Sequence, residues 1–134
     1  MKHIIFIALL TLLGVTGKTQ NLVGYSSGEI RDYMQKNYDD MGLEKVTNKM
    51  FKYLKYTDSY GDQTLLFFLN GDSVCRSMRL ICAMNIRNEK IKEFNDTFRK
   101  TGATRWIDTR NGRDYIIELK DDKWSCTFSI EPAK

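Results

Sequence analysis

The sequence predicts an α+β fold in which two αβββ units form one six-stranded antiparallel sheet with two helices packed on one face. The first observation is Asn70-Gly71, which separates two apolar runs within residues 61–82 and favours a hairpin with a type I′ turn. The second is Asn111-Gly112, which separates two further strand-like runs. The third is a stretch with helical spacing of apolar residues ahead of each hairpin.

The first helix is predicted over residues 27–41. Ser26 and Glu29 have the spacing of a capping box, in which each side chain bonds to the other residue's backbone N–H. Gly42 offers the left-handed conformation that commonly ends a helix. Residues 43–48 fit either an extension of this helix or a linker.

The three strands of the first unit follow this helix. Residues 50–57 are rich in aromatic side chains, which favours a strand, and residues 58–61 have the composition of a turn. The alternation of the hairpin assigns one covered face, made of Leu65, Phe67, Leu69, Val74, Met78, Leu80 and Cys82. The opposite face receives Leu66, Phe68, Ser73 and Cys75.

The second unit repeats this order. A helix is predicted over residues 88–101, with Asn88 as its cap and Gly102 just beyond its end. Strands are predicted over residues 104–109, 115–119 and 123–130. In the last strand the alternation is complete, and it assigns to the covered face Trp124, Cys126, Phe128 and Ile130.

The two units, at about residues 26–82 and 88–131, match weakly in sequence, with the hairpin residues at a constant offset of fifty. An internal duplication explains the match, and so does the general similarity of any two amphipathic αβββ units. The element order resembles the tandem repeats of the β-lactamase-inhibitor-protein-like fold, which also occurs in small outer-membrane assembly lipoproteins. The resemblance covers most of residues 20–134 and implies the fold only, because no family motif identifies a functional residue.

The N-terminus is typical of a secretory signal peptide. Lys2 and His3 precede an apolar run over residues 4–15, and small or polar residues follow. This pattern resembles the export signals of Bacteroidetes, and we predict a signal peptide over residues 1–19 with cleavage before Gln20. The alternative is an ordered apolar element. The expected product is a single domain of residues 20–134, periplasmic or secreted, without membrane insertion and with a flexible lead-in to Tyr25.

The charges and the histidine content exclude several functions. Cleavage would remove Lys2 and Lys18, so 19 basic and 17 acidic residues would remain, with a net charge of +2. These charges are scattered, which argues against a nucleic-acid partner. His3 is the only histidine, so the exported chain would lack the commonest general base. We therefore predict no catalytic residues, no metal site and no cofactor.

The three cysteines allow two interpretations. Three free, buried thiols are favoured, because the core is apolar enough to be stable without a covalent link. If the third and sixth predicted strands are antiparallel neighbours, Cys82 and Cys126 are the one pair that could form a disulfide.

The sheet face away from the helices is the predicted binding surface. Its candidate partner-binding residues combine apolar and hydrogen-bonding side chains, and they are Leu66, Phe68, Ser77, Arg79, Arg105, Ser125, Thr127 and Ser129. These residues favour the hypothesis that the protein is a monomeric binding or inhibitor module of the cell envelope. Its expected partner is a protein or an envelope ligand. The alternative is an envelope assembly component that dimerises through this face. A third hypothesis is an enzyme that uses Cys75 or carboxylates.

Overall fold

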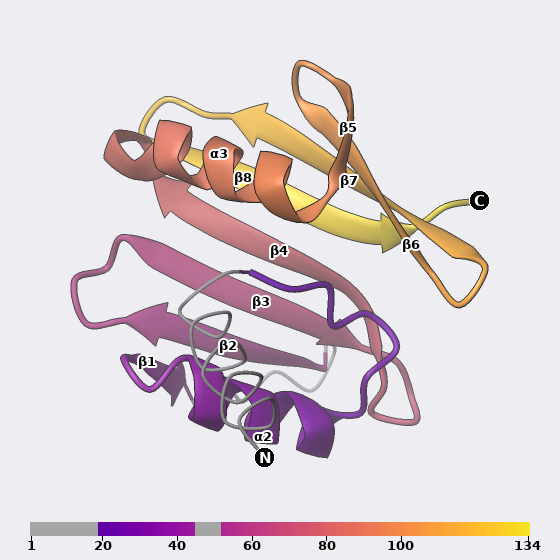
Figure 1. The fold of residues 1–134 in the computed structure, drawn as a ribbon. Coiled ribbons are helices and arrows are strands. Elements are labelled where there is room, and N and C mark those ends of the chain that lie inside the picture. The colour runs from indigo at the N-terminus through magenta and orange to yellow at the C-terminus, as the bar shows by residue number, and fades with distance from the viewer. Residues whose placement is uncertain (1–18, 45–51) are drawn as a thin grey trace, which may run out of the picture.

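The computed structural model describes residues 19–44 and 52–134. The predicted signal peptide up to residue 18 lies outside this range, as does most of the ambiguous segment 43–48. The described chain forms two helices, α2 (Ser27–Asn37) and α3 (Arg87–Thr97), and one antiparallel sheet (Figure 1). The strands are β1 (Met41–Glu44), β2 (Tyr53–Asp58), β3 (Gln63–Leu69), β4 (Cys75–Ala83), β5 (Arg99–Gly102), β6 (Arg105–Arg110), β7 (Arg113–Asp121) and β8 (Ser125–Pro132).

The sheet has eight strands, so the prediction of six strands is wrong, although the α+β class with one antiparallel sheet is correct. The strand order is β1-β2-β3-β4-β8-β7-β6-β5. Each half therefore contributes one helix and four strands, and the halves meet where β4 pairs with β8. The unpredicted strands, β1 and β5, lie at the two edges.

Most of β5 was predicted as the end of a helix, and β1 was predicted as a helix end followed by either a helical extension or a linker. α2 ends at Asn37, and Gly42 lies within β1 instead of ending the helix. α3 ends at Thr97, because Phe98 is its C-cap in an extended conformation (ψ 163°). Every residue of β5 is exposed, and β1 is exposed except for Met41. An edge strand without a buried face has no apolar alternation, so the sequence carries no signal for it.

Local capping explains where the helices begin. The Oγ of Ser26 accepts a hydrogen bond from the Glu29 N–H at 3.2 Å, and the Glu29 carboxylate accepts one from the Ser26 N–H at 3.1 Å, so the predicted capping box is confirmed. Asn88 does not cap the second helix. A 3-10 turn over Met84–Ile86 leads directly into α3, whose N-cap is Ile86.

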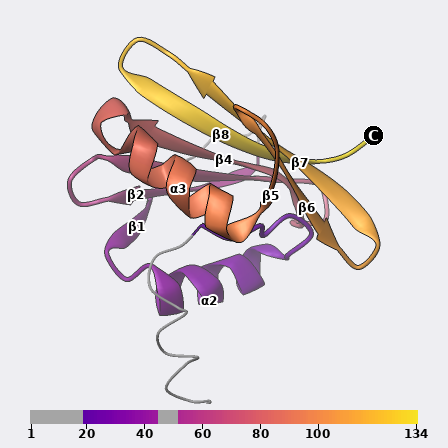
Figure 2. The same ribbon diagram turned by 45° about the horizontal axis from the view of Figure 1, so that its top comes forward.

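Both helices cover the same face of the sheet (Figure 1 and Figure 2). Beneath α3, the ring of Phe94 lies 4.2 Å from that of Phe128 and 5.7 Å from that of Trp106, measured between centroids. Beneath the other half of the sheet, Tyr56 meets Phe67 edge to face at 6.1 Å. These contacts form one continuous apolar core.

The lead-in segment, residues 20–25, contributes to this core, which contradicts the expectation that it is flexible. It crosses the helix side of the sheet between α2 and α3 (Figure 1). Leu22 and Val23 are each 3% exposed. The N–H of Gly24 donates to the Cys75 carbonyl at 2.8 Å, and the N–H of Cys75 donates to the Tyr25 carbonyl at 2.8 Å. The segment thus closes the gap between the two helices.

The two Asn-Gly pairs form different turns. At Asn111-Gly112 both residues have positive φ, 54° and 73°, so the predicted two-residue turn is a type I′ turn. At Asn70-Gly71 a hairpin forms, but the type I′ turn predicted there is wrong. The positive φ there belongs to Ser73 (61°), and the Ser73 N–H donates to the Asn70 carbonyl at 3.0 Å.

A bulge next to this turn reverses one predicted face. Phe68 pairs with Ser77 but Leu69 pairs with Cys75, so the register shifts between Phe68 and Leu69. Because one extra residue exchanges the two faces of a strand, Cys75 is buried on the covered face instead of the opposite one. Trp124 was also misplaced: it lies in the turn before β8 and is 79% exposed.

The centre of the sheet is symmetric. Across β4 and β8, Met78 pairs with Ile130 and Leu80 pairs with Phe128. Adding fifty to Met78 gives Phe128 and adding fifty to Leu80 gives Ile130, so each pair corresponds to the other when the two halves are exchanged. The pair between them is Arg79 with Ser129. The offset is not constant, since Leu66 and Glu118 occupy equivalent places beside this pair and differ by fifty-two. The fold therefore has an internal two-fold pattern, while duplication as its origin stays a prediction.

Candidate binding face of the sheet

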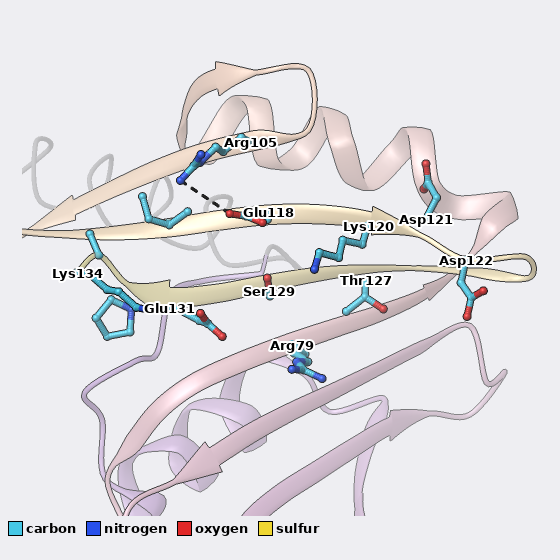
Figure 3. Close-up of a pocket in the computed structure, with 13 residues that line it drawn as sticks. Arg79, Arg105, Glu118, Lys120, Asp121, Asp122, Thr127, Ser129, Glu131 and Lys134 are labelled. Atoms are coloured by element: carbon cyan, nitrogen blue, oxygen red, sulfur yellow. Dashed lines mark ion pairs between the residues drawn. The ribbon is translucent and has the colours of Figure 1, made fainter.

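The face of the sheet opposite to α2 and α3, called here the open face, contains a shallow hollow of about 800 Å³ (Figure 3). β4, β6, β7, β8 and the residues that follow β8 supply its lining. Its charged and hydroxyl-bearing side chains include Arg79, Arg105, Glu118, Lys120, Thr127 and Ser129. Because the hollow is wide, a ligand within it would keep much of its surface in contact with water.

Strand register places these side chains in rows that run across the sheet. Arg79 on β4 is opposite Ser129 on β8, which is opposite Glu118 on β7 and then Arg105 on β6. In the next row, Ile81 is opposite Thr127, which is opposite Lys120. Side chains directly opposite on one face have Cβ atoms about 4.5–5.5 Å apart, so each row forms a continuous strip of contacts.

Ion pairs occupy some of the charges on this face and leave others free. Arg105 and Glu118 approach to 3.8 Å, and both side chains are about half exposed. Lys55 and Glu44 approach to 3.2 Å at the far edge of the same face. Among the described residues, Arg79 and Lys120 are in no ion pair. Exposed pairs of this kind stabilise a fold by less than about 1 kcal/mol, so the unpaired charges are the more informative feature.

An aromatic patch adjoins the hollow on the side of the first unit. The ring of Phe68 lies 5.4 Å from the Arg79 guanidinium carbon and 6.0 Å from that of Arg76. Tyr53 packs against the same ring at 6.2 Å between centroids. Leu66 and Phe68 are half-buried, so this patch has apolar area that a partner could cover.

The predicted site residues all lie on the open face, but the structure separates them into two groups. Arg79, Arg105, Thr127 and Ser129 line the hollow. Leu66, Phe68 and Ser77 lie beside it on β3 and β4, and Ser125 is at the start of β8.

Six charged lining residues were not among the predicted site residues, namely Glu118, Lys120, Asp121, Asp122, Glu131 and Lys134. The alternation that selects Ser125, Thr127 and Ser129 continues to Glu131, so extending it by one step would have found this residue. The same alternation on β7 joins Ile116 to Glu118 and Lys120.

The thiols are unsuited to nucleophilic chemistry at neutral pH. Cys75, Cys82 and Cys126 are buried and free. Burial first, and the adjacent Cys126 second, raise the pKa of Cys82 to about 12. Burial likewise raises the pKa of Cys75 to about 11. A thiol with such a pKa is protonated at neutral pH, whereas the thiolate is the reactive form. Cys82 and Cys126 are directly opposite each other on β4 and β8. They are the two cysteines that the sequence identified as the one pair able to form a disulfide if these strands were neighbours.

A smaller hollow of about 430 Å³ lies on the helix side, between the lead-in and β6. Its wall is held by Arg110, whose guanidinium donates to the carbonyls of Asn21 and Val23 and to the Tyr115 hydroxyl. The Asn21 amide also donates to the Asp108 carboxylate at 2.9 Å. Because Arg110 and Asp108 already bond to neighbouring carbonyl, hydroxyl and amide groups, this hollow offers a ligand fewer free partners than the open face.

No three His, Cys, Asp or Glu side chains cluster as metal ligands within residues 19–44 and 52–134. None of the helices in these residues is long and apolar enough to span a membrane. Comparison with protein-family models, curated proteins and solved structures finds no match for the chain. The resemblance in element order therefore stays a prediction.

Proposed function

We propose that the protein is an exported binding or inhibitor module, without catalytic activity, that receives its partner on the open face. The observation that carries this proposal is the placement of Arg79, which has no ion pair among the described residues, beside the half-buried Phe68, on the side of the sheet away from both helices. Lys120, likewise without an ion pair there, lies further across the same face on β7. Binding surfaces combine apolar anchors with a few polar groups that select the partner. The high pKa values of the thiols support a role without nucleophilic catalysis.

The shape of the open face favours a protein partner over a small ligand. Small-molecule sites enclose most of the ligand surface, whereas this hollow is shallow and continues into the Phe68 patch. A convex protein surface could contact both at once. An envelope glycan would be the other occupant, and the experiment below separates the two.

Export is part of the proposal. It is supported by the basic and apolar pattern of residues 1–19, and it puts the first residue of the exported chain at Gln20, next to the lead-in that closes the core. The intact mass of protein from an envelope or culture-medium fraction should correspond to residues 20–134. Full-length protein confined to the cytoplasm would refute export.

The test of the binding proposal compares matched surface variants. Tagged wild-type protein, Arg79→Glu and Phe68→Ala would be used to capture partners from envelope extracts of the source cells. Lys92→Glu, on the exposed side of α3, is the control because it makes the same change of charge as Arg79→Glu on the opposite side of the molecule. A captured protein would then be purified and its affinity measured by calorimetry.

We expect Phe68→Ala to weaken binding by ~1–3 kcal/mol and Arg79→Glu to abolish it, with Lys92→Glu equal to wild type. Melting temperatures measured in parallel should stay within a few degrees of wild type. Equal capture by all variants, or no capture by the wild type, refutes the proposal. Capture of glycan alone would mean that the open face binds an envelope ligand and not a protein. If light scattering shows a dimer of the wild type and a monomer of Arg79→Glu, the alternative function of an assembly component that dimerises through this face is favoured.

A further inference from the structure

We propose that the centre of the open face is a carboxylate-binding site. Arg79 is the main residue that binds the carboxylate, and Lys120 is the second cation. The hydroxyls of Thr127 and Ser129 lie between them on β8 as additional donors. This inference rests on the proposed function and deepens it, because it identifies the group that the protein partner presents as an Asp or Glu side chain.

The geometry brings four donors together from three strands. Arg79 is directly opposite Ser129, and Thr127 is directly opposite Lys120. Ser129 and Thr127 are two residues apart on β8 and therefore share a face. Figure 3 shows Arg79 and Lys120 on either side of β8, with Thr127 and Ser129 between them. The long side chains of Arg79 and Lys120 can thus reach one ligand placed over β8.

Of the two arginines that line the hollow, Arg79 is the one without a carboxylate partner among the described residues. In the described part of the chain, Arg105 pairs with Glu118 and Arg87 pairs with Asp121 at 2.7 Å. Arg79 has no such partner there, and its contact is with the Phe68 ring. A ring against one side of a guanidinium limits its rotation and leaves its N–H groups free to bind a carboxylate with two parallel hydrogen bonds.

The charges of the side chains that line the hollow favour a carboxylate over a phosphate as the bound group. Four basic and four acidic side chains line the hollow. Two of the acids are paired with cations, Glu118 with Arg105 and Asp121 with Arg87, while Asp122 accepts a hydrogen bond from the Lys123 N–H at 2.7 Å and keeps its charge. Asp122 and Lys134 lie at opposite ends of the hollow in Figure 3, so the charges nearest its centre are those of Arg79, Lys120 and Glu131, with a sum of one positive charge. One positive charge matches a singly charged carboxylate better than a phosphate dianion.

Glu131 also supplies a direct prediction. It is two residues beyond Ser129 on the same face of β8, within diagonal reach of the Arg79 side chain. A ligand carboxylate must therefore compete with Glu131 for the guanidinium. Removing this acid should strengthen binding, whereas a structural role for Glu131 would not produce that gain.

The experiment is an NMR titration of the protein at constant ionic strength. The probe is N-acetyl-glutamate α-amide, which carries one side-chain carboxylate, and its glutamine counterpart is the uncharged control. The signals to follow are the Arg79 Nε–H and the backbone amides of Lys120, Thr127 and Ser129. We expect shifts that saturate with the carboxylate probe and are absent with the glutamine probe. Inorganic phosphate is titrated as the third probe.

Variants decide which side chains bind. Arg79→Gln should weaken the carboxylate probe about tenfold or more, since hydrogen bonds to charged groups contribute about 1.5–3 kcal/mol. Arg76→Gln is the matched control, because Arg76 is also an exposed arginine beside Phe68 but lies in the bulge, outside these rows, and it should leave the affinity unchanged. Glu131→Gln should raise the affinity several-fold.

Shifts that do not saturate, or that persist in Arg79→Gln, overturn the inference, as does tighter binding of phosphate than of the carboxylate probe. These outcomes remain distinct from failure of the proposed function. If the probe does not bind but partner capture still depends on Phe68, the open face binds its partner through other chemistry. If the probe binds but the open-face variants capture as well as wild type, the proposed function fails and the local carboxylate site remains.

Discussion

Truncation of two phenylalanines tests the assignment of the two faces of the sheet. Phe128 on β8 is 0% exposed, and its ring lies 4.2 Å from Phe94 and 5.8 Å from Trp106. Phe128→Ala therefore leaves a cavity enclosed by other rings, and we expect a loss of ~3–5 kcal/mol in the free energy of unfolding. Phe68 is half-buried on the open face, where Phe68→Ala removes mainly cation–π contacts with Arg76 and Arg79. The expected loss there is about 1 kcal/mol.

Urea unfolding followed by circular dichroism measures both losses, and thermal melting offers a second readout. For a chain of this size, each 1 kcal/mol corresponds to about 4 °C, so Phe128→Ala should lower the melting temperature by about 12–20 °C and Phe68→Ala by about 4 °C. A loss below about 1 kcal/mol for Phe128→Ala, together with a collapse of the transition for Phe68→Ala, would show that the two faces are reversed.

Three other predictions follow from the core and the turns. Arg110→Ala should cost ~2–3 kcal/mol and increase amide hydrogen exchange in the lead-in, because it removes three hydrogen bonds at once. Burial raises the pKa of Cys82 from 9.0 to about 12, so the free energy of unfolding should be unaffected below pH 9 and fall as the pH rises toward about 12. Cys82→Ala should remove that part of the fall. Gly112→Ala should destabilise by about 1–2 kcal/mol, because its φ is 73°. Gly71→Ala should cause no such loss, since a Cβ there meets no atom within 4 Å and its φ is not in the left-handed region.

Signals confined to a few neighbouring residues predicted local structure well. The capping box of Ser26 and Glu29 and the hairpin turn at Asn111-Gly112 depend on contacts within four residues, and both form as predicted, the turn being of type I′. The alternation along β8 identified the buried Cys126, Phe128 and Ile130. It failed at Trp124, because the alternation in the sequence begins one residue before the strand itself does.

Errors arose where distant segments determine the conformation. Cys75 changed faces because a bulge beside the Asn70 turn adds one residue to β4, and no local pattern marks that insertion. The lead-in is buried because α2 and α3 leave a gap between them that Leu22 and Val23 fill. The edge strands form by pairing with β2 and β6, although their own residues are largely exposed.

By itself, the sequence determined that a helix followed by antiparallel strands occurs twice, though not that each unit has four strands, and which residues on most strands share a face, because apolar periodicity records whether each side chain is covered. It also identified the eight candidate residues of the open face by that same periodicity. Only the tertiary structure decided which of these residues meet. Arg79 and Ser129 are fifty positions apart, and they lie side by side because β4 pairs with β8 at the centre of the sheet. The register of such a pairing is set by the packing of the whole core against the two helices, so no segment of the sequence encodes it alone.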